Sequence, residues 1–161
     1  MTRNLKPPAT IACNRVLEYA ILDEPVRYSG HSNLFRGDEE VGPVACLAIC
    51  EDLKRNKVVL LHCDRDWAVQ GTEGYKSARE ARESVERVYP GVSYLWVDAH
   101  VTEQQAGKHL EEIWGGQRCN FCGRTSLELD PMRMIEKNGS WICESCVKTC
   151  YELLQSDGPI T

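Results

Sequence analysis

Four cysteines in the last third of the chain have the spacing of metal ligands. They form two pairs, Cys119 with Cys122 and Cys143 with Cys146, and two residues separate the members of each pair. A tight turn inside each pair puts both sulfurs on one side, and two such turns can close a tetrahedron around a zinc ion. Between the pairs, "KNGS" at 137–140 is a strong signal for a two-residue hairpin turn, which would bring the second pair back to the first. The pattern therefore predicts a Zn²⁺ site with these four cysteines as ligands.

The alternatives for these cysteines are a redox site and an iron–sulfur cluster. A thioredoxin-like redox site uses one Cys-x-x-Cys at the start of a helix and does not need a second pair. An iron–sulfur cluster can use four thiolates, but the spacing and the hairpin suit zinc better. A catalytic zinc normally keeps an open position beside three protein ligands, so four cysteines favour a closed structural site. We expect the metal to fold a module of about 40 residues, which is too small to fold alone, and not to perform chemistry.

A second group of reactive residue types follows an apolar run and consists of His62, Cys63, Asp64 and Asp66. Neighbours along a strand point to opposite faces, so we do not expect His62 and Cys63 to meet as a catalytic pair. The run "GDEE" at 37–40 has carboxylates that a cation could use, but a charge run in a glycine-rich loop is usually solvated. The sequence has no nucleophile elbow, dinucleotide fingerprint or metal-hydrolase motif. We therefore predict that the protein is not an enzyme.

The elements that must position these residues begin with short strands. Apolar runs at 44–50 and 58–64, joined by a polar segment, predict a β-hairpin. Residues 15–23 predict another strand, with a helix as the alternative, and 92–99 predict a further strand. Residues 26–43 are rich in Gly, Ser, Asn and Asp and predict a loop.

Two helices are also predicted before the cysteine pairs. The first covers 77–89 and begins with a capping box formed by Ser77 and Glu80. The second begins with a similar box formed by Thr102 and Gln105 and ends at two glycines. The expected apolar faces consist of Ala78, Ala81, Val85, Val88 and Tyr89 in the first helix, and of Ala106, Leu110, Ile113 and Trp114 in the second.

This order of elements predicts an α+β fold, with a small mixed or antiparallel sheet and two helices. We place a domain boundary at the two glycines, so that an α+β domain covers 1–116 and the four-cysteine zinc module covers 117–161. We expect the module to be a hairpin followed by a helix. That helix would carry one apolar stripe, formed by Val147, Cys150, Tyr151 and Leu154.

The composition argues against several classes of function. The net charge of -5 and the pI of about 5.4 disfavour non-specific binding to nucleic acid or to an anionic membrane, and they suit a basic protein partner. We find no apolar run of about 18 residues and no signal-peptide pattern, so we expect a cytoplasmic protein that does not enter a membrane. In that reducing compartment, an odd number of cysteines, nine in all, does not fit a disulfide framework. Those outside the pairs are expected to be small apolar residues: Cys13, Cys46, Cys50, Cys63 and Cys150.

The segments "CNFCGRTSLEL" and "MIEKNGSWICESCVKTCYELL", which cover 119–129 and 134–154, closely resemble the zinc-binding domain of the ClpX unfoldase family. That family has the pattern Cys-x-Phe-Cys-Gly-(Lys/Arg), a spacer, then Ile-Cys-(Asp/Glu)-x-Cys and a helix with a further Cys. The resemblance implies zinc ligation by the four paired cysteines, and a non-catalytic domain that dimerises and docks substrates and adaptor proteins. The chain departs from the family in having no Gly-x-x-x-x-Gly-Lys-(Ser/Thr) phosphate loop, and its spacer is slightly longer.

The region before the module loosely resembles small uncharacterised bacterial proteins. These carry a Cys-Asp-x-x-Trp strand end, a Ser-x-x-Glu-Ala helix and a Tyr-x-Gly-Val-x-x-x-Trp strand. The resemblance implies a shared fold and no particular activity. It is carried here by Cys63, Asp64, Trp67, Ser77, Glu80, Ala81, Tyr89, Gly91, Val92 and Trp96.

These observations favour a protein-binding protein whose zinc module serves protein–protein contact or homodimerisation. One hypothesis within that class is an immunity protein of a bacterial toxin system, because such proteins are small, acidic and non-catalytic and neutralise a basic toxin by charge and shape complementarity. Another is an adaptor that delivers clients to an unfoldase or protease. A nucleic-acid-binding zinc-finger regulator is the alternative of a different class. It is disfavoured because residues 119–161 hold four Lys or Arg against six Asp or Glu.

Overall fold

The structure is a computed structural model that describes residues 5–22, 26–32, 34–36, 38–129 and 133–156. Its internal contacts divide the chain into two units, Met1–Ala106 and Gly107–Thr161. This division falls inside the helix α2 (Glu103–Trp114). The predicted domain boundary at residue 116 stays a prediction.

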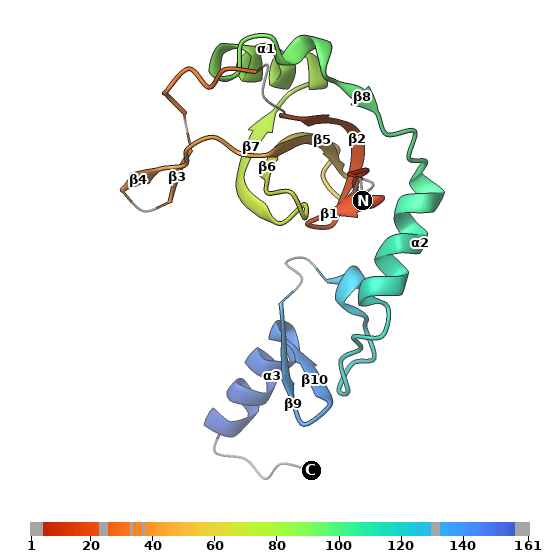
Figure 1. Cartoon of the computed structure of the whole chain (residues 1–161). Helices are drawn as coiled ribbons and strands as arrows, with labels where there is room; N and C mark the ends of the chain where they lie inside the picture. The colour runs from red at the N-terminus through yellow and green to blue at the C-terminus, as the bar shows by residue number, and fades with distance from the viewer. Residues whose placement is uncertain (1–4, 23–25, 33, 37, 130–132, 157–161) are drawn as a thin grey trace. The chain divides into compact units, whose positions relative to one another are not determined.

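The first unit is built on one antiparallel sheet, and Figure 1 shows its strands strongly curled around a common interior. Four longer strands lie side by side in the order β2 (Asn14–Ile21), β5 (Cys46–Asp52), β6 (Lys57–Cys63) and β7 (Val69–Tyr75). Two short strands, β1 (Thr10–Ile11) and β8 (Val97–Asp98), both pair with β2. With the helices described below, this confirms the predicted α+β class, and the sheet is antiparallel.

The predicted hairpin at 44–50 and 58–64 is confirmed by β5 and β6, which pair from Cys46 with Cys63 to Asp52 with Lys57. The strand predicted at 15–23 is also confirmed over its described part, since Asp23 lies outside the described residues. We did not predict β7. The turn that leads into it is held by Asp64, whose Oδ1 accepts hydrogen bonds from the backbone N–H groups of Asp66 and Ala68, both at 2.9 Å.

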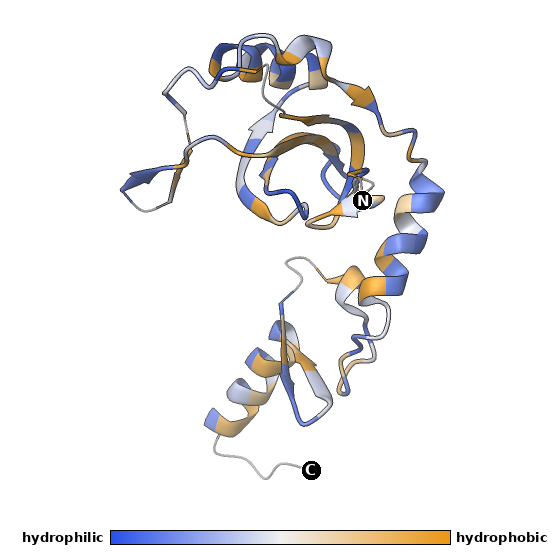
Figure 2. Cartoon of the chain, in the orientation of Figure 1, coloured by the Kyte–Doolittle hydropathy of each residue, from blue (hydrophilic) through white to orange (hydrophobic). Residues whose placement is uncertain are grey.

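Each face of the sheet has its own core because side chains alternate along the strands. On one face, Leu47, Ile49 and Leu60 pack against Ala81 and Val85 of the helix α1 (Ala78–Val88). Figure 2 shows the resulting bands of hydrophobic residues along the central strands, while most of α1 is coloured as hydrophilic. The apolar face predicted for the first helix therefore lies against the sheet.

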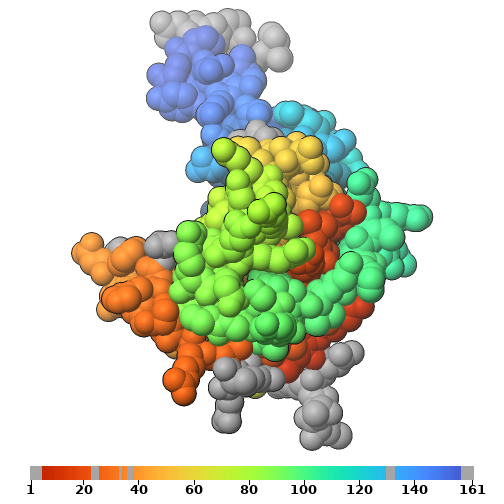
Figure 3. Space-filling model, turned by 90° about the horizontal axis from the view of Figure 1, so that it is seen from above, coloured from red at the N-terminus to blue at the C-terminus, as the bar shows by residue number. Residues whose placement is uncertain are grey.

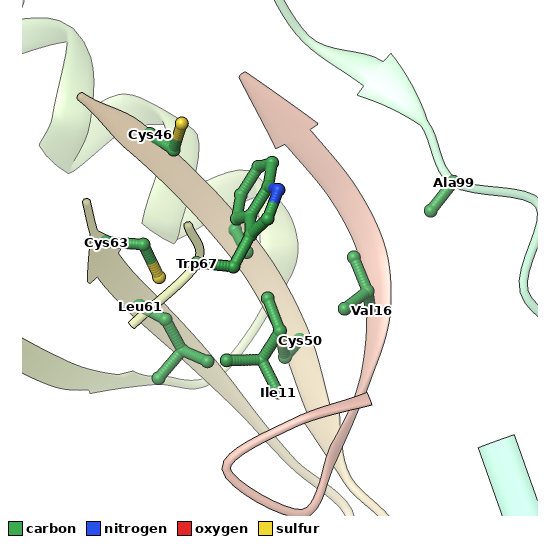
Figure 4. Close-up of a cluster of buried hydrophobic side chains, with 9 residues drawn as sticks. Ile11, Val16, Cys46, Cys50, Leu61, Cys63, Trp67 and Ala99 are labelled. Carbon is green, nitrogen blue, oxygen red and sulfur yellow. The ribbon is translucent and has the colours of Figure 1, made fainter. Parts of the chain in front are cut away.

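The opposite, concave face closes around Trp67 (Figure 4). Tyr19 contacts the indole edge-on, with ring centroids 5.8 Å apart. Three cysteines of this core have no exposed surface, and burial raises the pKa of the Cys63 thiol to about 12, so it is an inert apolar group as expected. The rest of the cluster consists of Ile11, Val16, Cys46, Ala48, Cys50, Leu61 and Ala99.

The cap of α1 differs in one detail from the predicted box. The Ser77 hydroxyl accepts a hydrogen bond from the Glu80 N–H at 3.2 Å, as expected. The Glu80 carboxylate, however, accepts from the N–H of Lys76 at 3.0 Å and not from that of Ser77. On the same helix, the Arg82 guanidinium reaches Glu18 of β2, with Nε 2.8 Å from Oε2, and so ties α1 to the sheet.

The strand predicted over 92–99 is largely wrong. Gly91 has a φ of 93°, and a single 3₁₀ turn, η1 (Val92–Tyr94), follows it. Val92 is fully buried, Leu95 packs on the same core, and Tyr94 between them is 93% exposed. This spacing of three suits a 3₁₀ turn, and only β8 at the end of the segment joins the sheet.

The segment predicted as a loop, 26–43, contains a small hairpin formed by β3 (Phe35–Arg36) and β4 (Glu39–Glu40). Figures 1 and 3 both show this part of the chain projecting from the side of the first unit. Asn33 and Gly37 lie outside the described residues. The Glu40 carboxylate joins the two ends of the segment, because it accepts a hydrogen bond from the Tyr28 hydroxyl at 3.0 Å, and the Tyr28 ring contacts Tyr89 with centroids 5.5 Å apart.

The predicted second helix corresponds to α2, and its capping box is complete. The Thr102 N–H donates to Gln105 Oε1 at 2.9 Å, and the Gln105 N–H donates to Thr102 Oγ1 at 3.2 Å. Its predicted apolar stripe is only partly buried: Ala106 is inaccessible, whereas Ile113 is 49% exposed. Across the described ranges, no helix combines the length and apolar character needed to span a bilayer.

Candidate metal centre

The second pair of cysteines is placed by a hairpin and a helix. The strands β9 (Met134–Lys137) and β10 (Ser140–Cys143) are joined by Asn138 and Gly139, whose φ angles are 53° and 77°. Positive φ at both central residues is the geometry of a type I′ turn, so the hairpin predicted from "KNGS" is confirmed. Cys143 ends β10 and begins the helix α3 (Glu144–Gln155), which puts Cys146 in the first helical turn.

The first pair lies on a tight turn closed by two backbone hydrogen bonds. The Cys119 N–H donates to the Arg124 carbonyl at 2.8 Å, and the Gly123 N–H donates to the Cys119 carbonyl at 2.9 Å. Gly123 has a φ of 75°, which is why a glycine suits this position. The turn directs the sulfurs of Cys119 and Cys122 to one side, as the two-residue spacing predicts.

Hydrogen bonds across the module bring the two pairs together. The Asn120 N–H donates to the Trp141 carbonyl at 2.8 Å, and the Trp141 N–H donates to Asn120 Oδ1 at 2.6 Å. The Cys143 N–H points at the Cys119 sulfur, 3.4 Å away. The first turn is therefore fixed on β10 beside the second pair.

The four sulfurs, from Cys119, Cys122, Cys143 and Cys146, all lie within 4.8 Å of one another. Zinc–sulfur bonds of about 2.3 Å in a tetrahedron require sulfurs about 3.8 Å apart. The Cys122 and Cys143 sulfurs are already 3.7 Å apart. Soft thiolates with this spacing suit a single zinc ion, and they leave no room for a cluster of several irons. The residues present therefore fit zinc, and the four cysteines are placed to hold it.

Backbone N–H groups favour the thiolate form of one ligand, Cys119. Burial works to raise the pKa of the Cys119 thiol, but hydrogen bonds from the backbone N–H groups of Cys122, Cys143 and Phe121 outweigh it and lower that pKa to about 6. Burial and the neighbouring thiols raise the pKa of Cys146 to about 12. Zinc binds the thiolate form, so the ion supplies the charge that lets all four sulfurs ionise together.

The module has little apolar core of its own. Its hydrophobic cluster contains Cys119, Leu129 and Cys143, with Met134, Ile142 and Cys146 packed at the edge. Two of the three central members are metal ligands, so the metal site and the core are the same place. Cys150 is half-buried one turn beyond Cys146 and lies outside the group of four sulfurs.

The second group of reactive residues does not bring His62 and Cys63 together, but Asp64 and Asp66 line a cavity with Glu39 and Glu40. His62 pairs in register with Leu47, whose side chain packs under α1, and its Nε2 lies 3.3 Å from Glu73 Oε2. Cys63 belongs to the concave core on the opposite face, as predicted. The contact with His62 lowers the pKa of the Glu73 carboxyl despite its partial burial.

One residue near the sulfurs was missed by the sequence reasoning. The Arg124 Nε donates a hydrogen bond to the Cys122 sulfur at 3.4 Å. The signal that could have indicated it is the basic residue directly after the Cys-Gly dipeptide in "CGR". The positive charge of Arg124 faces a site that collects negative charge.

Residues 117–156 match the family of the ClpX C4-type zinc finger. The match covers the four cysteines, the β9–β10 hairpin and α3, and it includes no residue before Gln117. No solved structure matches the chain. The matched part of the chain is thus similar to the ClpX-type zinc-binding module, in agreement with the resemblance drawn from the residues.

Proposed function

We propose, on the premise that residues 117–156 are a ClpX-type zinc module, that this protein is a non-enzymatic binding protein whose module makes protein–protein contacts. Four cysteines around one zinc leave no open coordination position for a substrate. The metal then acts by holding the hairpin, the first turn and α3 together as one surface. The observation that carries the proposal is the apolar character of that surface.

Among its described residues, the zinc module leaves five large apolar side chains exposed. In α3 no residue is buried, and Tyr151, Leu153 and Leu154 are 63%, 51% and 69% exposed. Phe121 beside the first turn and Ile135 on β9 are 68% and 58% exposed. Figure 2 shows hydrophobic residues recurring along α3. Such a concentration on a small module indicates a contact surface, since exposed apolar patches mark interaction sites.

A groove adjoins this surface and gives a partner side chain a place to enter. It has a volume of about 400 Å³ and is lined by Arg133, Met134, Ile135, Glu144 and Val147. Apolar walls between one positive and one negative side chain are typical of an interface with a protein segment. A second copy of the chain and a different protein are both partners that this surface suits.

The experiment replaces Tyr151 and Leu154 by serine in the full-length zinc-loaded protein. The matched control is Glu152→Ala, an exposed polar position of the same helix. Sedimentation equilibrium measures self-association, and affinity purification from the native host measures partner capture. We expect the double variant to lose self-association or its partner while keeping its zinc, and the control to keep both. A double variant that associates and captures partners like the wild type contradicts the proposal.

We further propose that the partner is a basic protein, in the manner of a toxin bound by its immunity protein. The first unit supports this with a cavity of about 570 Å³ at the base of the β3–β4 hairpin. Its lining includes Glu39, Glu40, Asp64, Asp66 and Arg65, so negative charge predominates. Charge complementarity of this kind accelerates association with a basic partner and makes the affinity sensitive to salt.

Affinity purification separates this role from that of an adaptor. Recovery of a basic protein encoded beside this one, with binding weakened by Glu39→Lys and left intact by Glu83→Lys on α1, supports the immunity function. Recovery of an unfoldase or protease instead supports the adaptor function. Tight, salt-sensitive binding of RNA or DNA in a filter assay contradicts both.

We also place the protein in the cytoplasm. None of the nine cysteines forms a disulfide, and a zinc site made of thiolates is maintained most readily in a reducing compartment. Cell fractionation followed by immunoblotting tests this location.

A further inference from the structure

The four zinc ligands are sheltered unequally. Cys119 and Cys143 have 1% and 0% of their surface exposed, and Cys146 is half-buried. Cys122 is exposed. A competing chelator or an electrophile therefore reaches the site first at the Cys122 sulfur, which makes that zinc–sulfur bond the weak point of the site.

Arg124 lies against this exposed ligand. Its Nε donates to the Cys122 sulfur at 3.4 Å, and its guanidinium also interacts electrostatically with Cys143 and Cys146. The Arg124 carbonyl meanwhile accepts the Cys119 N–H at 2.8 Å, which fixes the backbone of Arg124 inside the same turn. The side chain is thus anchored close to the sulfurs by its own main chain.

The charge of the loaded site explains what Arg124 does there. One divalent zinc with four thiolates carries a formal charge of minus two, which a positive side chain beside the most exposed ligand would offset. A guanidinium is always protonated, and a charge-assisted hydrogen bond to a thiolate reduces that charge without competing for the metal.

We propose that Arg124 is a positioning residue that holds Cys122 on the zinc and slows release of the metal through that ligand. It acts on the sulfur and does not bind the ion itself. Groups that orient metal ligands typically contribute about 10- to 100-fold to metal affinity. Because this contact is exposed, we expect a smaller effect, about 3- to 10-fold in the rate of zinc loss.

Arg118 provides a matched control. It is an arginine of the same turn, but its guanidinium donates to the Gly123 carbonyl. Replacing it removes one positive charge and one hydrogen bond from the turn. It therefore reports the general effect of loosening this part of the module.

The test measures transfer of zinc from the full-length protein to the chromogenic chelator 4-(2-pyridylazo)resorcinol. The variants are Arg124→Gln, Arg124→Lys and the control Arg118→Gln, each checked first for one zinc per chain. We expect zinc release to be about 3- to 10-fold faster for Arg124→Gln than for the wild type. Arg124→Lys, which keeps the charge but loses the directed Nε donor, should fall between them, and Arg118→Gln should stay within about twofold of the wild type.

An unchanged rate for Arg124→Gln, or an equal acceleration by Arg118→Gln, overturns the proposal. If Arg124→Gln does not load zinc, the rate of zinc release from Arg124→Lys tests the proposal. A release rate equal to that of the wild type shows that the directed hydrogen bond from Nε does not slow metal loss. A second readout is limited alkylation by iodoacetamide during metal loss, in which a thiolate displaces iodide. Among the four ligands, mass spectrometry should find the first carbamidomethyl group on Cys122, and a first ligand modification on Cys146 contradicts the assignment. Cys13 and Cys150 lie outside the ligand group, so their modification is scored separately.

Discussion

Removal of zinc should unfold the C-terminal module while leaving the first unit intact. The magnitude follows from how little else stabilises the module. Among its described residues, Leu129 is the one large apolar side chain that is buried, and Met134 and Ile142 are partly buried beside it. Burial of three such side chains contributes about 5 kcal/mol, whereas a structural zinc contributes about 10–16 kcal/mol. Loss of the metal therefore removes more stabilising free energy than the whole apolar core supplies.

Hydrogen–deuterium exchange with mass spectrometry measures this directly on the full chain. After treatment with a chelator and a reductant, peptides from 117–156 should lose all protection. Peptides from β5 and β6, which lie in the centre of the other unit's sheet, should exchange as slowly as before. The substitution Cys143→Ser should reproduce the effect, and Cys150→Ser, at a position outside the ligand group, should not. Continued protection of β10 and α3 without metal would refute this reasoning.

Three smaller changes test other parts of the structure. Leu61 is fully buried in the concave core, so Leu61→Ala leaves a cavity there and should lower the free energy of unfolding by about 2–5 kcal/mol. Urea titration measures this, and a loss below about 1 kcal/mol would argue against that packing. Gly139→Ala strains the turn, where φ is 77°, by about 1 kcal/mol and should weaken zinc binding in chelator competition. Gly107→Ala is the control and should leave zinc binding unchanged, because an added methyl group there meets no atom within 4 Å. The Ser93 hydroxyl and the N–H groups of Gly91 and Ser93 hold the pKa of Glu86 below its unfolded value of 4.5. This stabilisation should be complete above about pH 4.5 and be lost as the pH falls below it. The free energy of unfolding of Glu86→Gln should therefore depend less steeply on pH in that window than that of the wild type, and an identical slope would contradict the assignment.

The elements that could be predicted from the sequence are those whose signals are local. The hairpin of β5 and β6 follows from two apolar runs, because both faces of these strands are buried. α1 and α2 were found from their capping residues and apolar spacing. The β9–β10 turn follows from Asn138 and Gly139, which tolerate positive φ without help from the rest of the fold.

The elements that were missed depend on partners distant in the sequence. The strand β7 contains Gly71, Gly74 and Glu73, which give little strand signal of their own, and it exists because β6 offers it hydrogen bonds at the edge of the sheet. A Cβ at position 71 would lie 2.7 Å from a methyl group of Leu34, so any residue larger than glycine would require the Leu34 side chain to move. Residues 92–99 were predicted as a strand, but burial of Val92 and Leu95 on the core of α1 favours a 3₁₀ turn at the start of this segment instead.

More of the candidate site than of the fold could be predicted, because the spacing of the cysteines alone indicates both the ligands and the metal. What could not be predicted is the order of exposure of the ligands. Cys119 and Cys143 are covered because the Asn120–Trp141 hydrogen bonds press the first turn onto β10, and that contact joins residues from opposite ends of the module. The contact of Arg124 with Cys122 depends on the same arrangement.

X-ray absorption spectroscopy at the zinc edge, on protein purified with its native metal, tests the central claim most directly. We expect one zinc per chain surrounded by four sulfur atoms at about 2.3 Å, with no nitrogen or oxygen in the first coordination shell. A shell that contains a water oxygen or a histidine nitrogen, or protein that holds no zinc, would contradict the closed four-sulfur site on which this account depends.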